Sequence, residues 1–329
     1  MKIKNLILCC LLFISHIACA SKTDSSLIIG DFMISKVTDG DTFRFKNLDK
    51  PVRLLGIDTE ETFKTPDAEQ KINEISQNWE AFYKAEKGDN KMPVKTDSPL
   101  GFEAWKWAED FFQNVDHVRL EREDDDRTID IFGRYLVYVI AVMKDATEIN
   151  YNVECVRKGY SPYFNKYGNS KRFHDEFVEA QNYAKQNNIG IWDPNKKHYP
   201  DYEERLAWWS LRADQLTSYE SNYTGRENYF NLSSAKDFAR LSNYVGQEVT
   251  VFGSIGEVKT EKFPYILRIP YTKEDRFELI VHEENAGLLQ EMDIETKKNY
   301  YVFIKGKLEN YNGTYQIVLR DKDQLWIQP

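Results

Sequence analysis

The chain has 329 residues, of which 41% are hydrophobic and 14% aromatic, enough apolar material for a packed core and about two domains. Its formal net charge is −9. An acidic chain binds nucleic acid poorly by passive attraction, so composition argues against a simple nucleic-acid-binding module. No internal span is long and apolar enough to cross a membrane, which argues against a transmembrane protein.

The N-terminal segment has the pattern of a secretory signal peptide, predicted over residues 1–20. A basic start precedes the apolar run Leu6–Ile14, and small residues follow at Ala18-Cys19-Ala20. Cleavage after Ala20 gives a soluble chain that begins at Ser21. Cleavage before Cys19 instead leaves a lipid-modified cysteine that anchors the protein to a bacterial envelope. The sequence leaves both outcomes open.

Cysteine usage excludes a disulfide framework in the body of the chain. Three of the four cysteines lie in the first 20 residues, and only Cys155 remains beyond them. We interpret Cys155 as a small buried apolar side chain on a helix and not as a reactive thiol.

Charged residues gather around two short apolar runs, Thr42–Phe45 and Val52–Ile57, each of which predicts a strand that ends in a turn. Strand alternation places Arg53 on the face opposite Val52 and Leu54. Carboxylates stand at the ends of both runs. A cation carried inward beside acids at a nearby turn is unusual for a plain sheet and suits a site that holds a metal ion and a phosphate together.

Residues 62–98 form a long charged segment, which we predict to be an inserted helix followed by a loop. A stripe of apolar residues at helical spacing predicts a helix over 101–114, whose aromatic rings belong to the core. The elements expected next are strands at 115–121 and 135–143, a short helix at 150–159 that ends at Gly159, and a longer helix at 170–187.

The composition changes after residue 198. An aromatic-rich helix or linker is expected over 202–216 and a Ser-capped helix over 233–244. Short strands follow, predicted at 248–255, 265–269, 277–282, 300–308, 315–319 and 325–327. Asn312-Gly313 predicts a hairpin turn. This pattern favours a small barrel of the oligonucleotide- or oligosaccharide-binding (OB) type. Its aromatics Tyr301, Tyr311 and Tyr315 either contact nucleic acid or belong to the core and ordinary surface; its acidic composition favours the second.

The polar side chains within residues 37–61, together with Arg134, indicate one kind of chemistry. Asp41, Asp58 and Glu61 supply hard oxygen ligands, which suit calcium or magnesium and not zinc. Arg53 and Arg134 are guanidinium forks that can grip phosphate oxygens in a bidentate way. A metal and two arginines would neutralise charge growing on phosphorus oxygens, and a carboxylate would orient or deprotonate water. The set therefore predicts cleavage of phosphodiester bonds.

Three motifs in one order resemble the staphylococcal nuclease (thermonuclease) family. They are Asp39-Gly40-Asp41-Thr42, the run from Val52 to Glu61, and Phe132-Gly133-Arg134. Val156-Arg157-Lys158-Gly159 and Ile189-Gly190-Ile191-Trp192 match later. The resemblance covers about residues 32–192, and the second small barrel lies outside it.

The resemblance implies an α+β, β-barrel-rich fold: an OB-like five-stranded barrel with three helices. It implies a Ca2+-dependent nuclease that hydrolyses DNA and RNA and leaves 3′-phosphate ends. Asp41, Asp58 and the Thr59 carbonyl would be metal ligands. The implied catalytic residues are Arg53, Glu61 and Arg134, with Glu61 as general base or water-positioning group. Tyr167 falls near a substrate-contacting tyrosine.

The chain departs from the family pattern at two places. Glu60 stands where the family usually has proline, which predicts a looser and more acidic turn. Ile131 and Phe132 replace a lysine–tyrosine pair that helps to bind nucleotide, which predicts weaker substrate binding or contacts supplied elsewhere. The insertion borders the site as a candidate lid or specificity loop.

We expect a nuclease-like domain over 30–195 with the insertion at about 62–98, a helical linker over 196–235 and an OB-like barrel over 236–329. The protein is expected to be a monomer, exported, and either secreted, periplasmic or anchored through Cys19. Two alternatives stay open. One is a catalytically weak or inactive nucleic-acid-binding scaffold, and the other is an envelope-anchored adhesion or assembly protein that does not hydrolyse its ligand.

Overall fold

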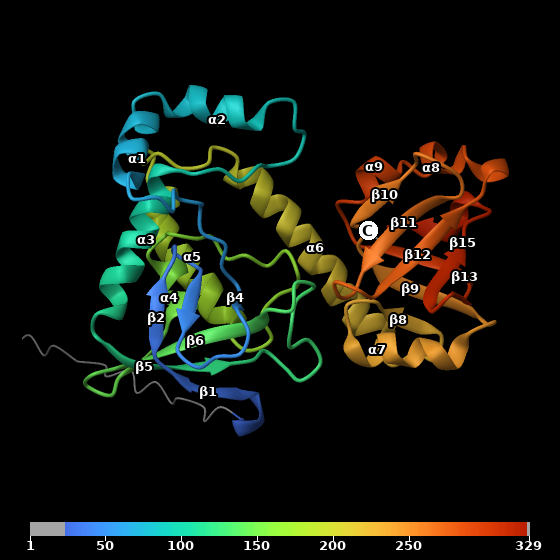
Figure 1. Ribbon diagram of the computed structural model, residues 1–329, viewed down its shortest axis with the longest axis horizontal. Coiled ribbons are helices and arrows are strands. Elements are labelled where there is room, and N and C mark those ends of the chain that lie inside the picture. The colour runs from blue at the N-terminus through green and yellow to red at the C-terminus, as the bar shows by residue number, and fades with distance from the viewer. Residues whose placement is uncertain (1–23, 328–329) are drawn as a thin grey trace, which may run out of the picture.

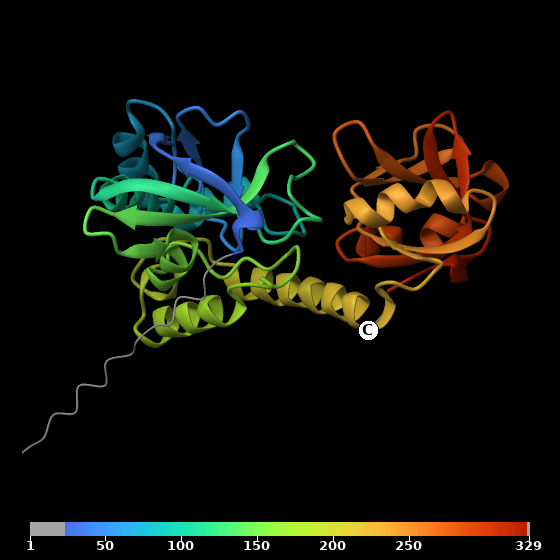
Figure 2. The ribbon, with the colours of Figure 1, turned by 90° about the horizontal axis from the view of Figure 1, so that it is seen from below.

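The computed structural model describes residues 24–327, so the predicted signal peptide, with Cys19 and both cleavage positions, lies outside the described residues. The fold is mixed α+β and has two β-rich units (Figure 1). Their cores are separate: one cluster of buried apolar side chains falls within residues 43–180 and another within residues 230–325. The long helix α6 (Tyr202–Tyr223) runs from the N-terminal unit to the C-terminal unit (Figures 1 and 2).

The N-terminal unit is built on a five-stranded sheet. Its path is β1 (Ile28–Phe32), β5 (Val115–Glu121), β6 (Tyr135–Met143) and β4 (Val52–Leu54), and β7 (Glu148–Asn150) pairs with β6. Strands β4 and β6 are parallel, whereas β5 and β6 are antiparallel. A separate ribbon pairs β2 (Ile34–Val37) with β3 (Phe43–Phe45). The strands predicted at 115–121 and 135–143 are confirmed.

Strand β4 carries its cation as the alternation predicts. Val52 and Leu54 are buried on one face, while Arg53 is partly exposed on the other. Gly56 follows with φ +73°, and a Cβ there would lie 2.4 Å from the Phe177 ring. Glycine is therefore required both by the backbone and by the close packing of the turn that follows β4.

The helices of this unit are α1 (Ala68–Ser76), α2 (Trp79–Lys87), α3 (Pro99–Phe112), α4 (Tyr151–Arg157) and α5 (His174–Gln186). Helices α3, α4 and α5 follow the predicted order with some changes of boundary. The single helix predicted for the insertion is wrong, because Gln77 and Asn78 separate α1 from α2. Trp79 and Tyr83 of α2 pack with Tyr199 and Tyr202 in a small apolar cluster of their own. The insertion is therefore held by the start of α6.

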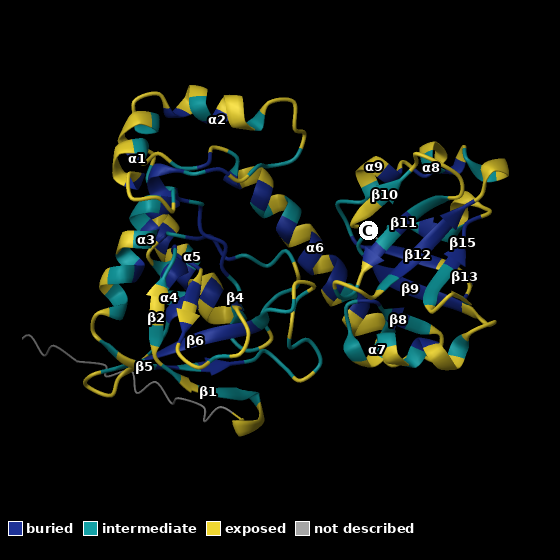
Figure 3. Cartoon of the chain, in the orientation of Figure 1, coloured by how far each residue is buried: buried dark blue, intermediate teal, exposed yellow. Residues whose placement is uncertain are grey.

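The C-terminal unit has two sheets around one core (Figure 3). One contains β10 (Glu257–Lys259), β11 (Tyr265–Pro270), β12 (Arg276–Val281), β15 (Thr314–Val318) and β14 (Glu309–Tyr311). The other contains β16 (Leu325–Trp326), β13 (Val302–Lys307), β9 (Glu248–Gly253) and β8 (Tyr229–Asn231). The hairpin predicted at Asn312-Gly313 is confirmed, since both residues have positive φ.

Helices of the C-terminal unit are short: α7 (Ala235–Arg240), α8 (Leu288–Glu291) and α9 (Ile294–Lys297). Helix α7 is capped by the Ser234 side chain, and the chain then continues as a 3-10 helix from Leu241 to Tyr244. Tyr301 is 4% exposed and Tyr315 packs against the core, so these two aromatics are core residues, whereas Tyr311 is 66% exposed.

Candidate active site

The turn after β4 is fixed by hydrogen bonds from its backbone. The Asp58 N–H donates to Ser161 Oγ at 2.8 Å, and the Thr59 N–H donates to Asp41 Oδ2 at 2.9 Å. Asp41, Asp58 and Thr59 are all buried. The two short strands of the sequence thus bring Asp41 and Asp58 together, although 17 positions separate them.

Arg53, which lies on β4, contacts both carboxylates. Its Nη2 lies 2.6 Å from Asp58 Oδ1 and its Nη1 lies 3.6 Å from Asp41 Oδ2. Burial alone would lower the pKa of Arg53, but the two carboxylates outweigh burial and leave that pKa above its ordinary value. Arg53 therefore stays cationic, with part of its guanidinium facing the cleft.

Two lysines that the sequence did not single out complete the cluster. Lys95, from the segment after α2, places Nζ 2.7 Å from Asp58 Oδ1 and 4.0 Å from Glu61 Oε1. Lys64 places Nζ 2.7 Å from Asp39 Oδ2 and 3.8 Å from Glu61 Oε2. Glu61, with a side chain 40% exposed, thus stands at the mouth of the cluster between two ammonium groups.

The pKa values of the two buried carboxylates shift in opposite directions. Burial raises the pKa of Asp41 to about 6 even though Arg53 opposes the shift. Burial also disfavours ionised Asp58, but Lys95 and Arg53 outweigh it and lower the pKa of Asp58. Nearby cations therefore balance the negative charge of Asp41 less completely than that of Asp58.

Glu60 anchors the turn, so the prediction of a looser turn is wrong. Its side chain is 1% exposed. It accepts hydrogen bonds from the Tyr199 N–H at 2.6 Å, from the Tyr202 hydroxyl at 2.9 Å and from the Ser98 hydroxyl. These donors connect the turn to the N-terminus of α3 and to the start of α6, which holds Glu61 in place.

Arg134 enters the site from the start of β6 and is held by a neighbour. Its Nε and Nη2 lie 2.7 and 2.6 Å from Asp130 Oδ2. Asp130 also accepts the backbone N–H groups of Phe132 and Arg134, so it closes the turn before β6. This pair orients Arg134 but also engages part of the fork that would grip a phosphate.

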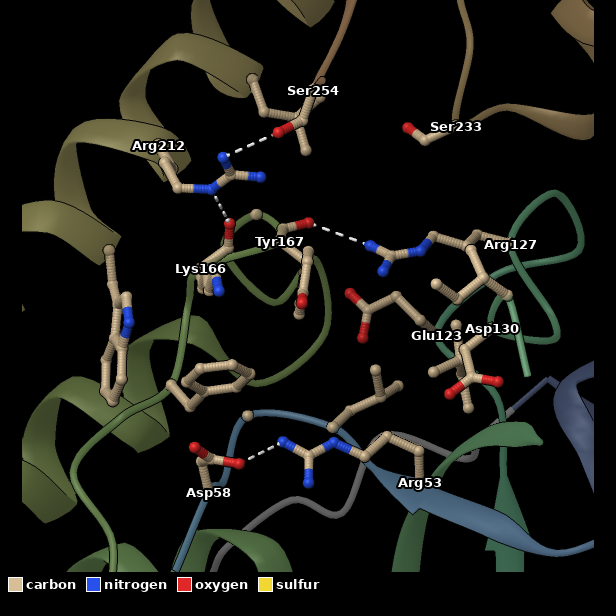
Figure 4. Close-up of a pocket in the computed structure, with 18 of the residues that line it drawn as sticks. Arg53, Asp58, Glu123, Arg127, Asp130, Lys166, Tyr167, Arg212, Ser233 and Ser254 are labelled. Atoms are coloured by element: carbon tan, nitrogen blue, oxygen red, sulfur yellow. Dashed lines mark hydrogen bonds and ion pairs between the residues drawn. The ribbon is translucent and has the colours of Figure 1, made fainter. Parts of the chain in front are cut away.

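The predicted residues line one cleft, with a volume of about 1200 Å3. They are Asp41, Arg53, Asp58, Glu61, Arg134 and Tyr167. Thr59 is buried behind this group and is not part of the lining. The far wall comes from α6 and from the C-terminal unit, including Ser233 and Ser254 (Figure 4). No motif predicts this far wall, because its residues lie outside the stretches that resemble the family.

The carboxylates of the cluster are of the chemical kind that a hard cation prefers. Asp41, Asp58 and Glu61 present carboxylate oxygens, and the Lys95 ammonium between Asp58 and Glu61 shows that a positive charge is accommodated there. Among residues 24–327, no group of three or more His, Cys, Asp or Glu side chains converges in a geometry that could hold a metal ion. A cation that replaces Lys95 would thus depend on backbone or water oxygens as well.

Cys155 is fully buried, and burial raises its pKa well above the ordinary value. A thiol that stays protonated is a poor nucleophile, which agrees with its interpretation as a core residue. No helix within residues 24–327 has the length and apolar character required to cross a membrane.

Comparison with known proteins locates the N-terminal unit in a family. Residues 51–194 match the model of the staphylococcal nuclease homologue family. An uncharacterized protein of Methanocaldococcus jannaschii is 27% identical over 162 residues, which cover 49% of this chain and 70% of that protein. The matched region contains Arg53, Asp58, Glu61 and Arg134 and excludes the C-terminal unit. Residues 51–194 therefore resemble the staphylococcal nuclease homologue family.

Proposed function

We propose that the protein is an exported, calcium-dependent nuclease that hydrolyses phosphodiester bonds of DNA and RNA with low sequence specificity. The observation that carries the proposal is the buried cluster in which Arg53 contacts both Asp41 and Asp58 while Glu61 stands at the mouth of the cleft. This arrangement places a fixed cation and an accessible carboxylate beside the same space. Both are what water attack on a phosphodiester requires.

The residues have separate parts in the reaction. Glu61 accepts a proton from water as that water attacks phosphorus, and Arg53 and Arg134 stabilise the negative charge that develops on the phosphoryl oxygens. The bond from phosphorus to the 5′-oxygen breaks, and that oxygen takes a proton from solvent water, which leaves a 3′-phosphate and a 5′-hydroxyl. Asp130 keeps Arg134 at the edge of the cleft through the contacts at 2.6 and 2.7 Å.

The proposed metal ligands are Asp41, Asp58 and the Thr59 carbonyl. A bound calcium ion would supply further positive charge for the phosphoryl oxygens. Lys95 and Arg53 both contact Asp58 Oδ1, so a metal ion would bind that oxygen only after the Lys95 side chain moves and beside the Arg53 guanidinium. Lys95 is 46% exposed and follows a loop, which permits such a movement.

The remaining assignments are also proposals. We propose that the nuclease-like domain spans 30–195, that 196–235 joins it to a barrel domain over 236–329, and that the protein is a monomer. Export rests on the N-terminal pattern, and mass spectrometry of the mature N-terminus distinguishes Cys19 lipidation from cleavage before Ser21.

Digestion of nucleic acid by the chain without residues 1–20 tests the function. Single-stranded DNA and RNA should both be degraded with calcium, products should carry 3′-phosphates, and chelation should stop the reaction. Full activity in chelator would remove the metal from the proposal.

The alternative of a weak or inactive scaffold has specific support, because Asp130 engages Arg134 and Lys95 occupies Asp58. Binding of single-stranded DNA without hydrolysis, with calcium in excess, would favour that alternative.

A further inference from the structure

The loop that follows α4 and lines the cleft contains a lysine without an acidic partner. Lys166 lies in the loop between α4 and α5, with Nζ 4.2 Å from the centre of the Trp208 ring of α6. Within residues 24–327, no carboxylate lies at ion-pair distance from its ammonium group. Every lysine around the β4 turn, by contrast, touches an acid.

This lysine is costly to the fold as it stands. Burial and the nearby Arg212 guanidinium lower the pKa of Lys166 to about 8. Taking an ammonium partly out of water without a partner is unfavourable, and an apolar side chain over Trp208 would avoid that penalty. The position is therefore better explained by an anion that is absent from the free protein than by stability.

Arg212 fixes the loop that carries Lys166 and joins it to the C-terminal unit (Figure 4). Its Nε donates to the Lys166 carbonyl at 3.0 Å. Its Nη1 donates to Ser254 Oγ at 3.1 Å and to the Asn299 carbonyl at 2.9 Å. Arg212 is 3% exposed and makes its polar contacts with neutral oxygens, so it adds positive charge behind the loop.

A second cation faces the same space from the other side. Arg127 Nη1 donates to the Tyr167 carbonyl at 3.0 Å, and its guanidinium lies 5.3 Å from the centre of the Tyr167 ring. No acidic side chain of the described chain pairs with Arg127 within ion-pair distance. Lys166 and Arg127 thus lie on two sides of Tyr167, as Figure 4 shows.

Exposed apolar side chains gather along this part of the cleft. Four of its lining residues are large hydrophobics that are 38% to 62% exposed: Ile129, Ile131, Phe132 and Tyr167. Aromatic faces beside unpaired cations are the usual elements of single-strand binding, in which bases stack and phosphates meet basic groups. Phe132, at 62% exposed, is the most open of the four.

We propose that Lys166 and Arg127 form a second anion-binding subsite, in which they bind backbone phosphates of single-stranded DNA or RNA on the two sides of Tyr167, away from the bond that is cleaved. The inference rests on the proposed nuclease function. It accounts for the loss of the family's lysine–tyrosine pair at Ile131 and Phe132, because it supplies a cation to the same cleft from another loop. The subsite depends on the C-terminal unit, which holds the loop through Arg212.

The size of the cleft is sufficient for more than one nucleotide. Its volume of about 1200 Å3 exceeds the roughly 300–1,000 Å3 that accommodates one drug-sized ligand, so more than one nucleotide fits. The subsite therefore acts on a substrate that extends beyond the scissile phosphate and is not used by a substrate with a single phosphodiester.

Binding and hydrolysis by Lys166→Gln test the subsite in the chain without residues 1–20. The probe is a fluorescein-labelled DNA strand of about ten nucleotides, within the span of known single-strand sites. We expect Kd and KM for this strand to rise about tenfold, which corresponds to about 1.4 kcal/mol, with kcat changed less than about twofold. The slope of log Kd against log salt should fall by about 0.7.

Lys106→Gln is the matched control, because Lys106 Nζ lies 4.4 Å from the Trp105 ring centre on the outer surface and is paired with Glu109. It should leave Kd and KM unchanged. A dinucleotide substrate should show the same KM in Lys166→Gln and the parent protein. Unchanged Kd for the ten-nucleotide strand would overturn the subsite. Because Kd is measured without calcium and needs no turnover, failure of the nuclease proposal would appear separately, as binding without hydrolysis.

Discussion

The two walls of the cleft hold their cations differently. At the β4 turn, Arg53 and Lys95 lie 2.6 and 2.7 Å from Asp58, and Lys64 lies 2.7 Å from Asp39. Across the cleft, neither Lys166 nor Arg127 has an acidic side chain at ion-pair distance among residues 24–327. The cations of the first wall are paired with acidic side chains of the fold. The cations of the second wall are not, so their positive charge is available to a ligand.

The difference separates two tasks. Compensated charges are held in fixed positions before substrate arrives, which is what stabilisation of a developing charge requires. Uncompensated cations gain most from a phosphate, so they contribute to binding. Changes at the first wall should therefore alter turnover, and changes at the second should alter affinity.

The largest effect is expected for Glu61→Gln. The amide keeps the size of the side chain but cannot accept a proton from water, so kcat should fall about 10²- to 10⁴-fold. Single-turnover hydrolysis of a labelled strand measures the change. The Kd of the strand should stay within a few-fold of the parent value, because Glu61 makes no contact with Lys166 or Arg127.

Glu103→Gln provides the control for this variant. Glu103 is a partly exposed carboxylate of α3 that pairs with Lys196, outside the lining of the cleft. Its kcat should equal that of the parent protein. A Glu61→Gln protein that turns over at the parent rate would show that the first wall does not contain the proton acceptor.

Glu60→Ala tests whether the first wall is fixed by its buried anchor. The change leaves the Ser98 hydroxyl, the Tyr199 N–H and the Tyr202 hydroxyl without their acceptor. Unpaired buried donors should lower the stability of the N-terminal unit by about 3 kcal/mol. Urea unfolding followed by tryptophan fluorescence measures this loss. Glu60→Gln retains one acceptor oxygen and should lose less than half as much; equal losses would contradict an anchoring role.

Lys95→Met removes the Lys95 ammonium group from the wall at the β4 turn and tests whether that group competes with calcium for Asp58. Without the ammonium group at 2.7 Å, Asp58 keeps only Arg53 as a cationic partner, so its carboxylate attracts a divalent ion more strongly and calcium affinity should rise about tenfold. Isothermal titration calorimetry measures the affinity independently of activity. Lys64→Met is the control, because Lys64 contacts Asp39 and Glu61 but not Asp58. An unchanged or weaker calcium affinity in Lys95→Met would show that Lys95 does not compete with calcium.

Local patterns predicted the carboxylates and Arg53 of the first wall. The alternation around Arg53 and the turn signals that end each run predicted strands β3 and β4, and the ordered motifs placed Asp41, Asp58 and Glu61 near one another. The N-terminal unit of an α+β fold and the second β-rich unit were predicted in the same way, since strand periodicity and turn residues are local properties.

The parts of the site that were not predicted depend on contacts between residues far apart in the sequence. Lys95 reaches Asp58 across the insertion, and Tyr199 reaches Glu60 from the start of α6. No residue spacing encodes either contact, so the sequence predicted a loose turn where the structure has a buried anchor. Lys166 looked like an ordinary loop lysine, because its lack of a partner is visible only after Trp208 and Arg212 are placed beside it.

The smallest expected effect is the pH dependence of the uncompensated wall. The charged groups that influence Lys166 are Arg212 of α6, Arg53 of β4, and Asp58 and Lys95 of the first wall. With a pKa of about 8, the Lys166 ammonium is largely present at pH 7 and largely lost at pH 9 in the free protein. Affinity for single-stranded DNA should therefore fall several-fold as the pH rises through about 8. Lys166→Gln should show no such fall.

The direction of the stability change separates this effect from unfolding. The pKa of Lys166 is about 8 in the fold and 10.5 in the reference state, so between these values the unfolded chain binds more protons than the folded chain. The contribution of Lys166 to the free energy of unfolding therefore rises with pH across that window. Fluorescence anisotropy should show that affinity falls as the pH rises. Urea titrations at the same pH values should show that the free energy of unfolding does not fall with it, because neutral Lys166 no longer destabilises the fold. A parallel fall of affinity in Lys166→Gln would assign the pH dependence to another group.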